Sequence, residues 1–134
     1  MPENQNQAIS EDHTTVKTIL VVEDDRSMAS FFVEAIKQET SHQALFAFDG
    51  HRALKMLHDL KPDLIVLDYS LPHMNGLELY DRIHAMKELE HTPALMISAH
   101  LPLEEAQKRK LTCLKKPVEL AELLQTIEKL LTQK

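Results

Sequence analysis

Four short apolar runs in this sequence each lead to residues that can bind a metal ion or a phosphate group. These residues are Glu23 and Asp24 after the run 19–22, Asp68 after the run 64–67, Ser98 after the run 94–97, and Lys116 after the run 111–114. Near-continuous apolar runs of this length indicate strands buried on both faces, as in a parallel sheet. Since ligands of open α/β sheets bind beyond the carboxyl ends of the strands, we expect these side chains to meet at one edge.

Three carboxylates that meet need a compensating charge. Two carboxylates about 4 Å apart repel by about 4 kcal/mol at an effective dielectric constant of about 20. Either protons remain on the acids or a cation lies between them. Mg²⁺ prefers oxygen ligands, uses a few carboxylates, and keeps waters that leave room for phosphate oxygens. We therefore predict Mg²⁺ as the cofactor of this site.

Asp68 is the candidate nucleophile, because it is a lone acid at the end of a central apolar run. A carboxylate can attack phosphorus in line and form an acyl phosphate. The adjacent acids Glu23 and Asp24 are better suited to sharing the metal. Lys116 would place an ammonium, and Ser98 a hydroxyl, against the phosphoryl oxygens, where such contacts stabilise a transferring group.

Strands and helices are expected to alternate along the whole chain. The expected strands are 18–23, 44–48, 63–68, 94–98 and 111–114, and the expected helices are 27–39, 51–60, 77–89, 102–109 and 118–131. This alternation predicts an α/β fold class, with a single doubly wound five-stranded parallel sheet that carries helices on both faces.

The chain of 134 residues, with 43% apolar and 27% charged residues, suits one globular domain. The polar residues 1–16 have no hydrophobic period and are expected to form a disordered tail before the domain at 17–134. A net charge of −6 argues against nonspecific nucleic-acid binding. No apolar stretch is long enough for a membrane span, and no signal peptide is recognisable.

Cys113 is the only cysteine and lies in an apolar run. The run predicts a buried thiol in a reducing compartment, so the expected location is cytoplasmic.

Four segments resemble the receiver domain of two-component response regulators, of the stand-alone chemotaxis-regulator-like type. The segments are VVEDD at 21–25, LDYSLPHMNG at 67–76, MISA at 96–99 and KP at 116–117. They occur in the family's order, with 44 residues from Asp24 to Asp68 and 30 from Asp68 to Ser98. The resemblance covers about residues 17–132. It implies a flavodoxin-like (βα)5 topology.

The resemblance also implies roles for the site residues. Asp68 would be the phosphoacceptor, and Glu23, Asp24, Asp68 and the backbone carbonyl of Ser70 would hold Mg²⁺. Lys116 would contact the phosphoryl group, and Ser98 would be the switch hydroxyl that moves toward it. The implied donor is a histidine kinase or a histidine phosphotransfer protein, and the downstream protein target is not named by the sequence.

Two positions depart from the family pattern. An aromatic residue usually lies three positions before the site lysine, and here that position is Cys113, so the aromatic half of the usual switch is missing. The span from Ser98 to Lys116 is 18 residues, about four shorter than in chemotaxis-type receivers, and lacks the usual Gly-Ala. Four residues are close to one helical turn, so we expect a shortened fourth helix on an altered output face.

Several other polar residues have simpler interpretations. Asp25 is expected to cap the first helix and Lys115 to be a surface residue. The eight histidines show no metal-ligand spacing and are expected at the surface. His100, two residues after Ser98, is the exception: by the resemblance it flanks the phosphoryl pocket, and we expect it, with Ser70, to tune the lifetime of the phosphate.

The leading function is a single-domain response regulator that is not an enzyme. It would accept a phosphoryl group on Asp68 and switch its protein-binding surface. Alternatives are a phosphorelay intermediate or a phosphate sink. A Mg²⁺-dependent aspartyl-phosphate phosphatase is a remote alternative. Haloacid dehalogenase-type enzymes need a second acid where this sequence has Ser70, and they need a cap domain that selects the substrate. A receiver-like protein without phosphorylation is disfavoured by the complete set of acids, serine and lysine.

Overall fold

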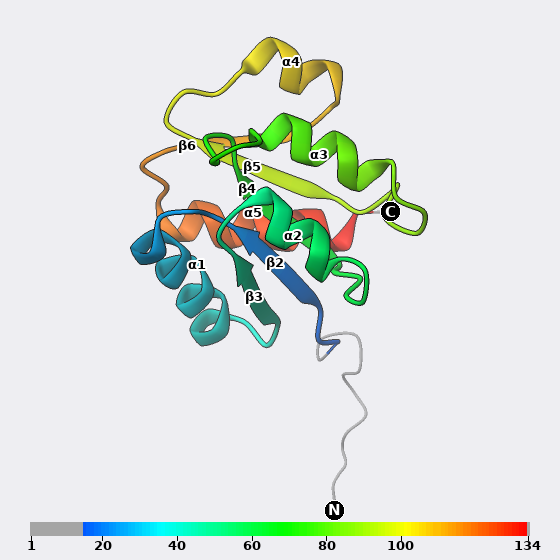
Figure 1. The fold of residues 1–134 in the computed structure, drawn as a ribbon. Helices are drawn as coiled ribbons and strands as arrows, with labels where there is room; N and C mark the ends of the chain where they lie inside the picture. The colour runs from blue at the N-terminus through cyan, green and yellow to red at the C-terminus, as the bar shows by residue number, and fades with distance from the viewer. Residues whose placement is uncertain (1–14, 134) are drawn as a thin grey trace, which may run out of the picture.

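The computed structural model describes residues 15–133, and its centre is one five-stranded sheet (Figure 1). The strands are β2 (Thr18–Val22), β3 (Gln43–Ala47), β4 (Leu64–Asp68), β5 (Ala94–Ser98) and β6 (Thr112–Lys115). Their order is β3-β2-β4-β5-β6, and every neighbouring pair is parallel. The predicted doubly wound parallel sheet is confirmed.

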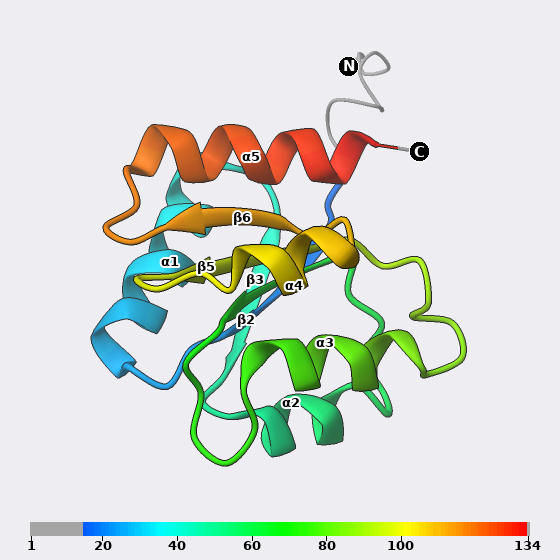
Figure 2. The ribbon, with the colours of Figure 1, turned by 90° about the horizontal axis from the view of Figure 1, so that it is seen from above.

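Helices cover both faces of the sheet. They are α1 (Arg26–Glu39), α2 (Gly50–Met56), α3 (Gly76–His84), α4 (Leu103–Lys108) and α5 (Leu120–Thr132). α1 and α5 lie on one face, and α2 and α3 lie on the other, with α4 next to α3 (Figure 2). The predicted shortening of the fourth helix is confirmed, since α4 has six residues.

Successive side chains of each strand point to opposite faces of the sheet and so contribute to two separate hydrophobic cores. In β2, Ile19 and Val21 pack under α1 and α5, whereas Leu20 and Val22 pack under α2 and α3. β2, β4 and β5 are almost wholly buried, as their apolar runs predicted.

The two edge strands are different. β3 exposes Leu45 and Phe46, and β6 is only partly buried. Cys113 lies on β6 and is half-buried, so the prediction of a buried thiol is wrong. The reason is that β6 is an edge strand, which pairs with β5 on one side only.

Side chains define where three helices begin. The Asp25 carboxylate accepts a hydrogen bond from the Met28 N–H at 3.0 Å, which confirms its predicted capping role. Asp49 accepts from Arg52 N–H at 2.7 Å in the same way. Asn75 and Glu78 form a reciprocal capping box at α3. This last cap fixes the end of the loop that follows Asp68.

Helix ends were predicted less accurately. α3 ends at His84 rather than residue 89: the chain continues as turns, and Glu88 has a positive φ of 79°, which a right-handed helix cannot contain. Leu89 is buried all the same, from a turn rather than a helix. α2 ends at Met56 rather than 60, and α5 begins at Leu120 rather than 118, directly after the Pro117 turn.

Within residues 15–133 no helix is long and apolar enough to cross a membrane. Most of the predicted tail, residues 1–14, lies outside the described residues.

Candidate metal and phosphoryl site

Three carboxylates converge at the carboxyl ends of β2 and β4. Glu23, Asp24 and Asp68 each offer an oxygen, and these oxygens all lie within 4.8 Å of one another. Glu23 and Asp68 are 2% and 5% exposed, whereas Asp24 is exposed. The parallel register of β2 with β4 produces this meeting, as predicted. Three oxygen donors at this separation, one of them open to water, fit a small divalent cation.

Lys116 supplies the positive charge of the site. Its Nζ donates to Glu23 Oε1 and to Asp68 Oδ2, each at 3.1 Å. The lysine follows β6 directly, and the Lys116–Pro117 peptide is cis. One ammonium is therefore shared between a predicted metal ligand and the predicted phosphoacceptor.

Backbone amides orient the two buried acids. The N–H of Asp25 donates to Glu23 Oε2, and the N–H of Ser70 donates to Asp68 Oδ1, both at 3.1 Å. The Ser70 side chain is exposed at the mouth of the site. Each carboxylate is thus held by an amide on one oxygen and by Lys116 on the other.

Gly76 lies against the backbone of Asp68, a contact that the sequence did not reveal. Its N–H donates to the Tyr69 carbonyl at 2.8 Å. A Cβ at this position would lie 2.5 Å from the Asp68 carbonyl oxygen and 2.9 Å from Tyr69 Cα. The turn sequence before Gly76 indicated a loop, but nothing in it indicated how closely the chain returns to β4.

Ser98 is the last residue of β5, beside β4, and is 2% exposed. Its hydroxyl accepts from the His100 N–H at 3.3 Å, and its carbonyl accepts from the Lys116 N–H at 3.0 Å. The His100 side chain is exposed. Glu23, Asp24, Asp68, Ser98 and Lys116 therefore lie at one edge of the sheet, as expected, although the Ser98 hydroxyl bonds a neighbouring amide rather than the acids.

Burial and neighbouring charge shift two pKa values. Burial raises the pKa of Glu23 to about 7, and the charge of Asp68 adds to the rise against the opposing bonds from Asp25 and Lys116. For Lys116, burial opposes the charged form, but hydrogen bonds and attraction to Asp68 and Glu23 outweigh it and raise the pKa. Lys116 is therefore a cation at neutral pH. The Glu23 carboxyl is about half protonated near pH 7.

Glu23→Gln is expected to stabilise the metal-free protein at alkaline pH. The folded protein holds the Glu23 proton up to about pH 7, whereas the unfolded chain releases it near the ordinary value of 4.5. Stability from this proton is complete below pH 4.5 and is lost as the pH rises through 7. Glutamine removes the charge and keeps one of the two acceptor oxygens, so its advantage should reach about 1–3 kcal/mol at pH 8.

Urea unfolding in EDTA at pH 4.5 and pH 8 measures this difference. The exposed Glu34→Gln is the matched control and should show no pH-dependent gain. A Glu23→Gln advantage that is equal at both pH values would contradict the assignment.

Cys113 is the position at which the resemblance noted in the sequence implies an aromatic ring. It lies on β6 opposite Met96 and packs against the core under α2 and α3. Burial raises the pKa of the thiol, and Sγ donates weakly to the Leu111 carbonyl at 3.7 Å. It is a small packing group with no contact to the acids.

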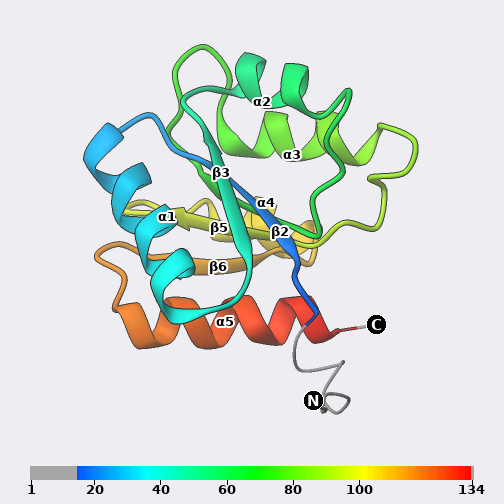
Figure 3. The ribbon, with the colours of Figure 1, turned by 90° about the horizontal axis from the view of Figure 1, so that it is seen from below.

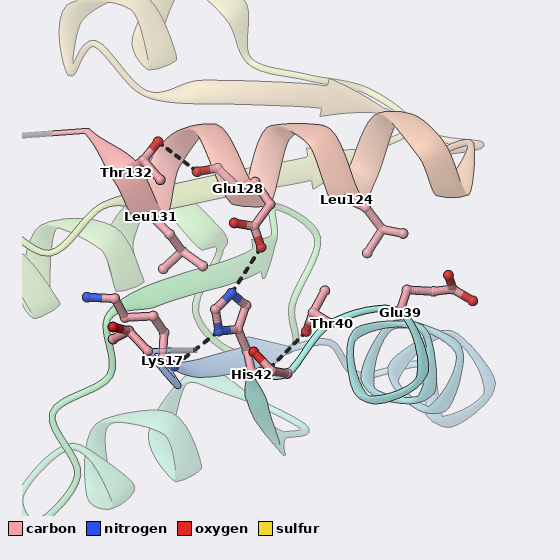
Figure 4. A pocket seen from close by; sticks show the side chains of 10 residues that line it. Lys17, Glu39, Thr40, His42, Leu124, Glu128, Leu131 and Thr132 are labelled. Atoms are coloured by element: carbon pink, nitrogen blue, oxygen red, sulfur yellow. Dashed lines mark hydrogen bonds and ion pairs between the residues drawn. The ribbon is translucent and has the colours of Figure 1, made fainter. Parts of the chain in front are cut away.

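A cavity of about 490 Å³ lies at the opposite end of the sheet, around His42 (Figure 4). The His42 side chain is 9% exposed. It accepts from the Lys17 N–H at 3.1 Å and bonds Glu128 on α5 at 2.9 Å. The expectation of surface histidines is therefore wrong for His42, and for the half-buried His84, because backbone and carboxylate partners satisfy their rings. These histidines join elements and lie far from the acids.

The family model of the response regulator receiver domain matches residues 19–128. Chemotaxis protein CheY-3 of Vibrio cholerae is 34% identical over 87 residues, which are 65% of this chain and 67% of that protein. The matched segment spans 23% and 33% of two longer curated relatives.

Solved structures share the fold. Chemotaxis response regulator CheY4 of Vibrio cholerae has a TM-score of 0.80 at 24% identity, covering 87% of this chain and 99% of that one. The receiver domain of sensor histidine kinase PA1611 from Pseudomonas aeruginosa, with a magnesium ion coordinated in its active site cleft, has a TM-score of 0.80 at 20% identity, covering 89% and 100%. With the acids, serine and lysine gathered as described, the family match shows that this chain belongs to the response regulator receiver domains.

Proposed function

We propose that the chain is a phosphorylation-controlled signalling module in which Asp68 accepts a phosphoryl group from a phosphohistidine donor. The observation that supports this most directly is the convergence on Asp68 of Lys116 at 3.1 Å and of the acids Glu23 and Asp24. A carboxylate flanked by an ammonium and a cation site is suited to phosphoryl transfer. The donor would be a histidine kinase or a histidine phosphotransfer protein.

Glu23, Asp24, Asp68 and the Ser70 backbone carbonyl would hold Mg²⁺, which neutralises charge between the acids and the phosphoryl oxygens. Asp24 is the exposed member of the acidic set and gives the ion a route from solvent. The magnesium ion in the cleft of the PA1611 receiver supports this assignment by analogy.

In the transfer step, a carboxylate oxygen of Asp68 would attack phosphorus while the donor's phosphorus–nitrogen bond breaks. The imidazole nitrogen keeps the electron pair and takes up a proton. The product is an acyl phosphate on Asp68, and water later cleaves it to inorganic phosphate and the carboxylate. Lys116 lies where its ammonium can follow the new charge, and Ser98 would offer its hydroxyl once it leaves the His100 amide.

The output of this module would be a change of protein-binding surface rather than catalysis on a substrate. We infer that the switch would depend on Ser98 and Lys116, because α4 is short and Cys113 provides no aromatic ring. A phosphorelay intermediate or a phosphate sink would use the same chemistry. The phosphatase alternative is disfavoured, because Ser70 stands where the second acid is needed and the described residues contain no cap domain.

Labelling with a small phosphodonor, acetyl phosphate or phosphoramidate, tests the proposal. With Mg²⁺, intact-protein mass spectrometry should detect one phosphoryl group per chain, removable by hydroxylamine as an acyl phosphate. In excess EDTA labelling should fall by about 10-fold or more, because the acids then repel the donor. A wild-type protein that stays unlabelled with both Mg²⁺ and donor would refute the function. Turnover of simple phosphate esters would favour the phosphatase.

His100→Ala is expected to shorten the phosphate lifetime severalfold. The His100 side chain is exposed two residues after Ser98, where it can cover the labelled Asp68 from water. The measurement is the rate of phosphate loss after the donor is removed. The exposed His91→Ala is the control, and an unchanged His100→Ala rate removes the tuning role; Ser70→Ala is tested in the same way.

A further inference from the structure

A shallow apolar groove lies between β3 and α2, outside the site described above. It has a volume of about 350 Å³ and is lined by Phe46, Ala47, Phe48, Arg52, Lys55 and Met56. Phe46 is 45% exposed, and its neighbour Leu45 is 41% exposed. Adjacent residues of a strand face opposite sides of the sheet, so Phe46, and not Leu45, supplies the exposed apolar ring of this groove.

The strand itself has a free edge. Among the described strands β3 pairs only with β2, so its outer backbone groups have no strand partner. In Figure 3, which looks onto this side of the sheet, no described helix or strand lies in front of β3. An uncovered edge strand with exposed apolar side chains is a surface that can pair with another polypeptide.

Two cations, Arg52 and Lys55, line the groove, and a third, Arg26, lies over one of its rings. The Arg26 guanidinium lies 4.1 Å from the centroid of the Phe48 ring, and the Phe46 and Phe48 rings are 4.8 Å apart. The Arg52 side chain is 67% exposed and is partly neutralised by Asp49 at 3.5 Å. Lys55 is exposed. These three side chains place positive charge beside the Phe46 and Phe48 rings, although the chain as a whole has a net charge of −6.

We propose that this groove docks an acidic segment of a partner protein that carries an apolar side chain between its carboxylates. The apolar side chain would cover Phe46, and the carboxylates would lie against Arg26, Arg52 and Lys55. A second copy of this chain fits poorly, because it would bring the same cations together. The inference goes beyond the proposed function and requires no phosphorylation.

The probe is the peptide acetyl-Asp-Glu-Ile-Phe-Glu-Asp-amide, titrated into ¹⁵N-labelled protein without a phosphodonor. We expect saturable amide shifts confined to residues 45–56 and Arg26. Two further peptides separate charge from apolar contact: one has lysine in place of every acid, and the other has serine in place of isoleucine and phenylalanine. Both should bind at least about 10-fold more weakly, the loss that about 1.4 kcal/mol produces.

Matched variants locate the contact. Phe46→Ser should weaken the acidic peptide about 10-fold, whereas Phe31→Ser, whose ring is 46% exposed on α1, should not. The double variant Arg52→Glu with Lys55→Glu should weaken it at least as much, and the same charge change at the exposed Lys87 and Lys129 should not.

The proposal would be overturned by equal binding of the lysine peptide, by shifts that map elsewhere, or by no effect of Phe46→Ser. Sedimentation showing a wild-type dimer that Phe46→Ser dissolves would assign the surface to a second copy instead, and overturn it too. Asp68→Asn should bind the peptide like the wild type, so a failed labelling experiment and a failed docking experiment are distinguishable.

Discussion

Asp68→Asn should abolish labelling by a small phosphodonor, with a loss of at least about 100-fold, because an amide is not a nucleophile toward phosphorus. The side chain changes little in shape, and its remaining oxygen can still accept from Lys116 or the Ser70 amide. The fold should therefore persist. Removal of one buried negative charge beside Glu23 should raise the melting temperature of the metal-free protein.

The measurement is intact-protein mass spectrometry after incubation with Mg²⁺ and acetyl phosphate. Asp59→Asn, a change of the same kind at an exposed acid in the turn after α2, is the control and should be labelled like the wild type. Undiminished labelling of a folded Asp68→Asn protein would place the acceptor at another residue.

Gly76→Ala should destabilise the fold by about 2–4 kcal/mol. The added Cβ would lie 2.5 Å from the Asp68 carbonyl oxygen and 2.9 Å from Tyr69 Cα, and both are backbone atoms. They cannot rotate away as a side chain could, so the end of β4 or the start of α3 must shift. The remaining folded protein should also label more slowly, because that shift moves Asp68.

Gly50→Ala is the matched control for this experiment. Gly50 and Gly76 are the only glycines in the chain, and each is the first residue of a helix. At Gly50 the new Cβ would meet only the flexible Met74 side chain, with its sulfur at 3.0 Å. Chemical denaturation should therefore place Gly50→Ala within about 1 kcal/mol of the wild type. Equal losses at the two glycines would contradict the backbone-contact argument.

The central strands and the acidic site could be predicted from the sequence because their causes are local. β2, β4 and β5 are buried on both faces, so each appears as an unbroken apolar run with its functional residue at the end. Parallel pairing then brings Glu23 and Asp68 together without further information. The shortening of α4 followed from a simple residue count between Ser98 and Lys116.

Features that depend on contacts across the fold could not be predicted. Leu89 continues the apolar period of α3 but is buried from a turn, because the preceding Glu88 has a positive φ of 79° that no right-handed helix contains. The outward position of Phe46 depends on β3 being an edge strand, which its composition does not indicate. The sharing of Lys116 between two acids likewise depends on three separate strands.

The position of Lys116 has a mechanical consequence. Its ammonium links the end of β6 to two acids, Glu23 directly after β2 and Asp68 at the end of β4, through two hydrogen bonds. In the proposed function, conversion of Asp68 to an acyl phosphate removes the negative charge of one acceptor of Lys116 and supplies the phosphoryl oxygens in its place. Lys116 would then exchange a carboxylate partner for a phosphoryl partner, and Lys116 belongs to the segment that leads into α5. Phosphorylation would thus change the contacts of the segment before α5, even though Cys113 provides no aromatic ring that could rotate.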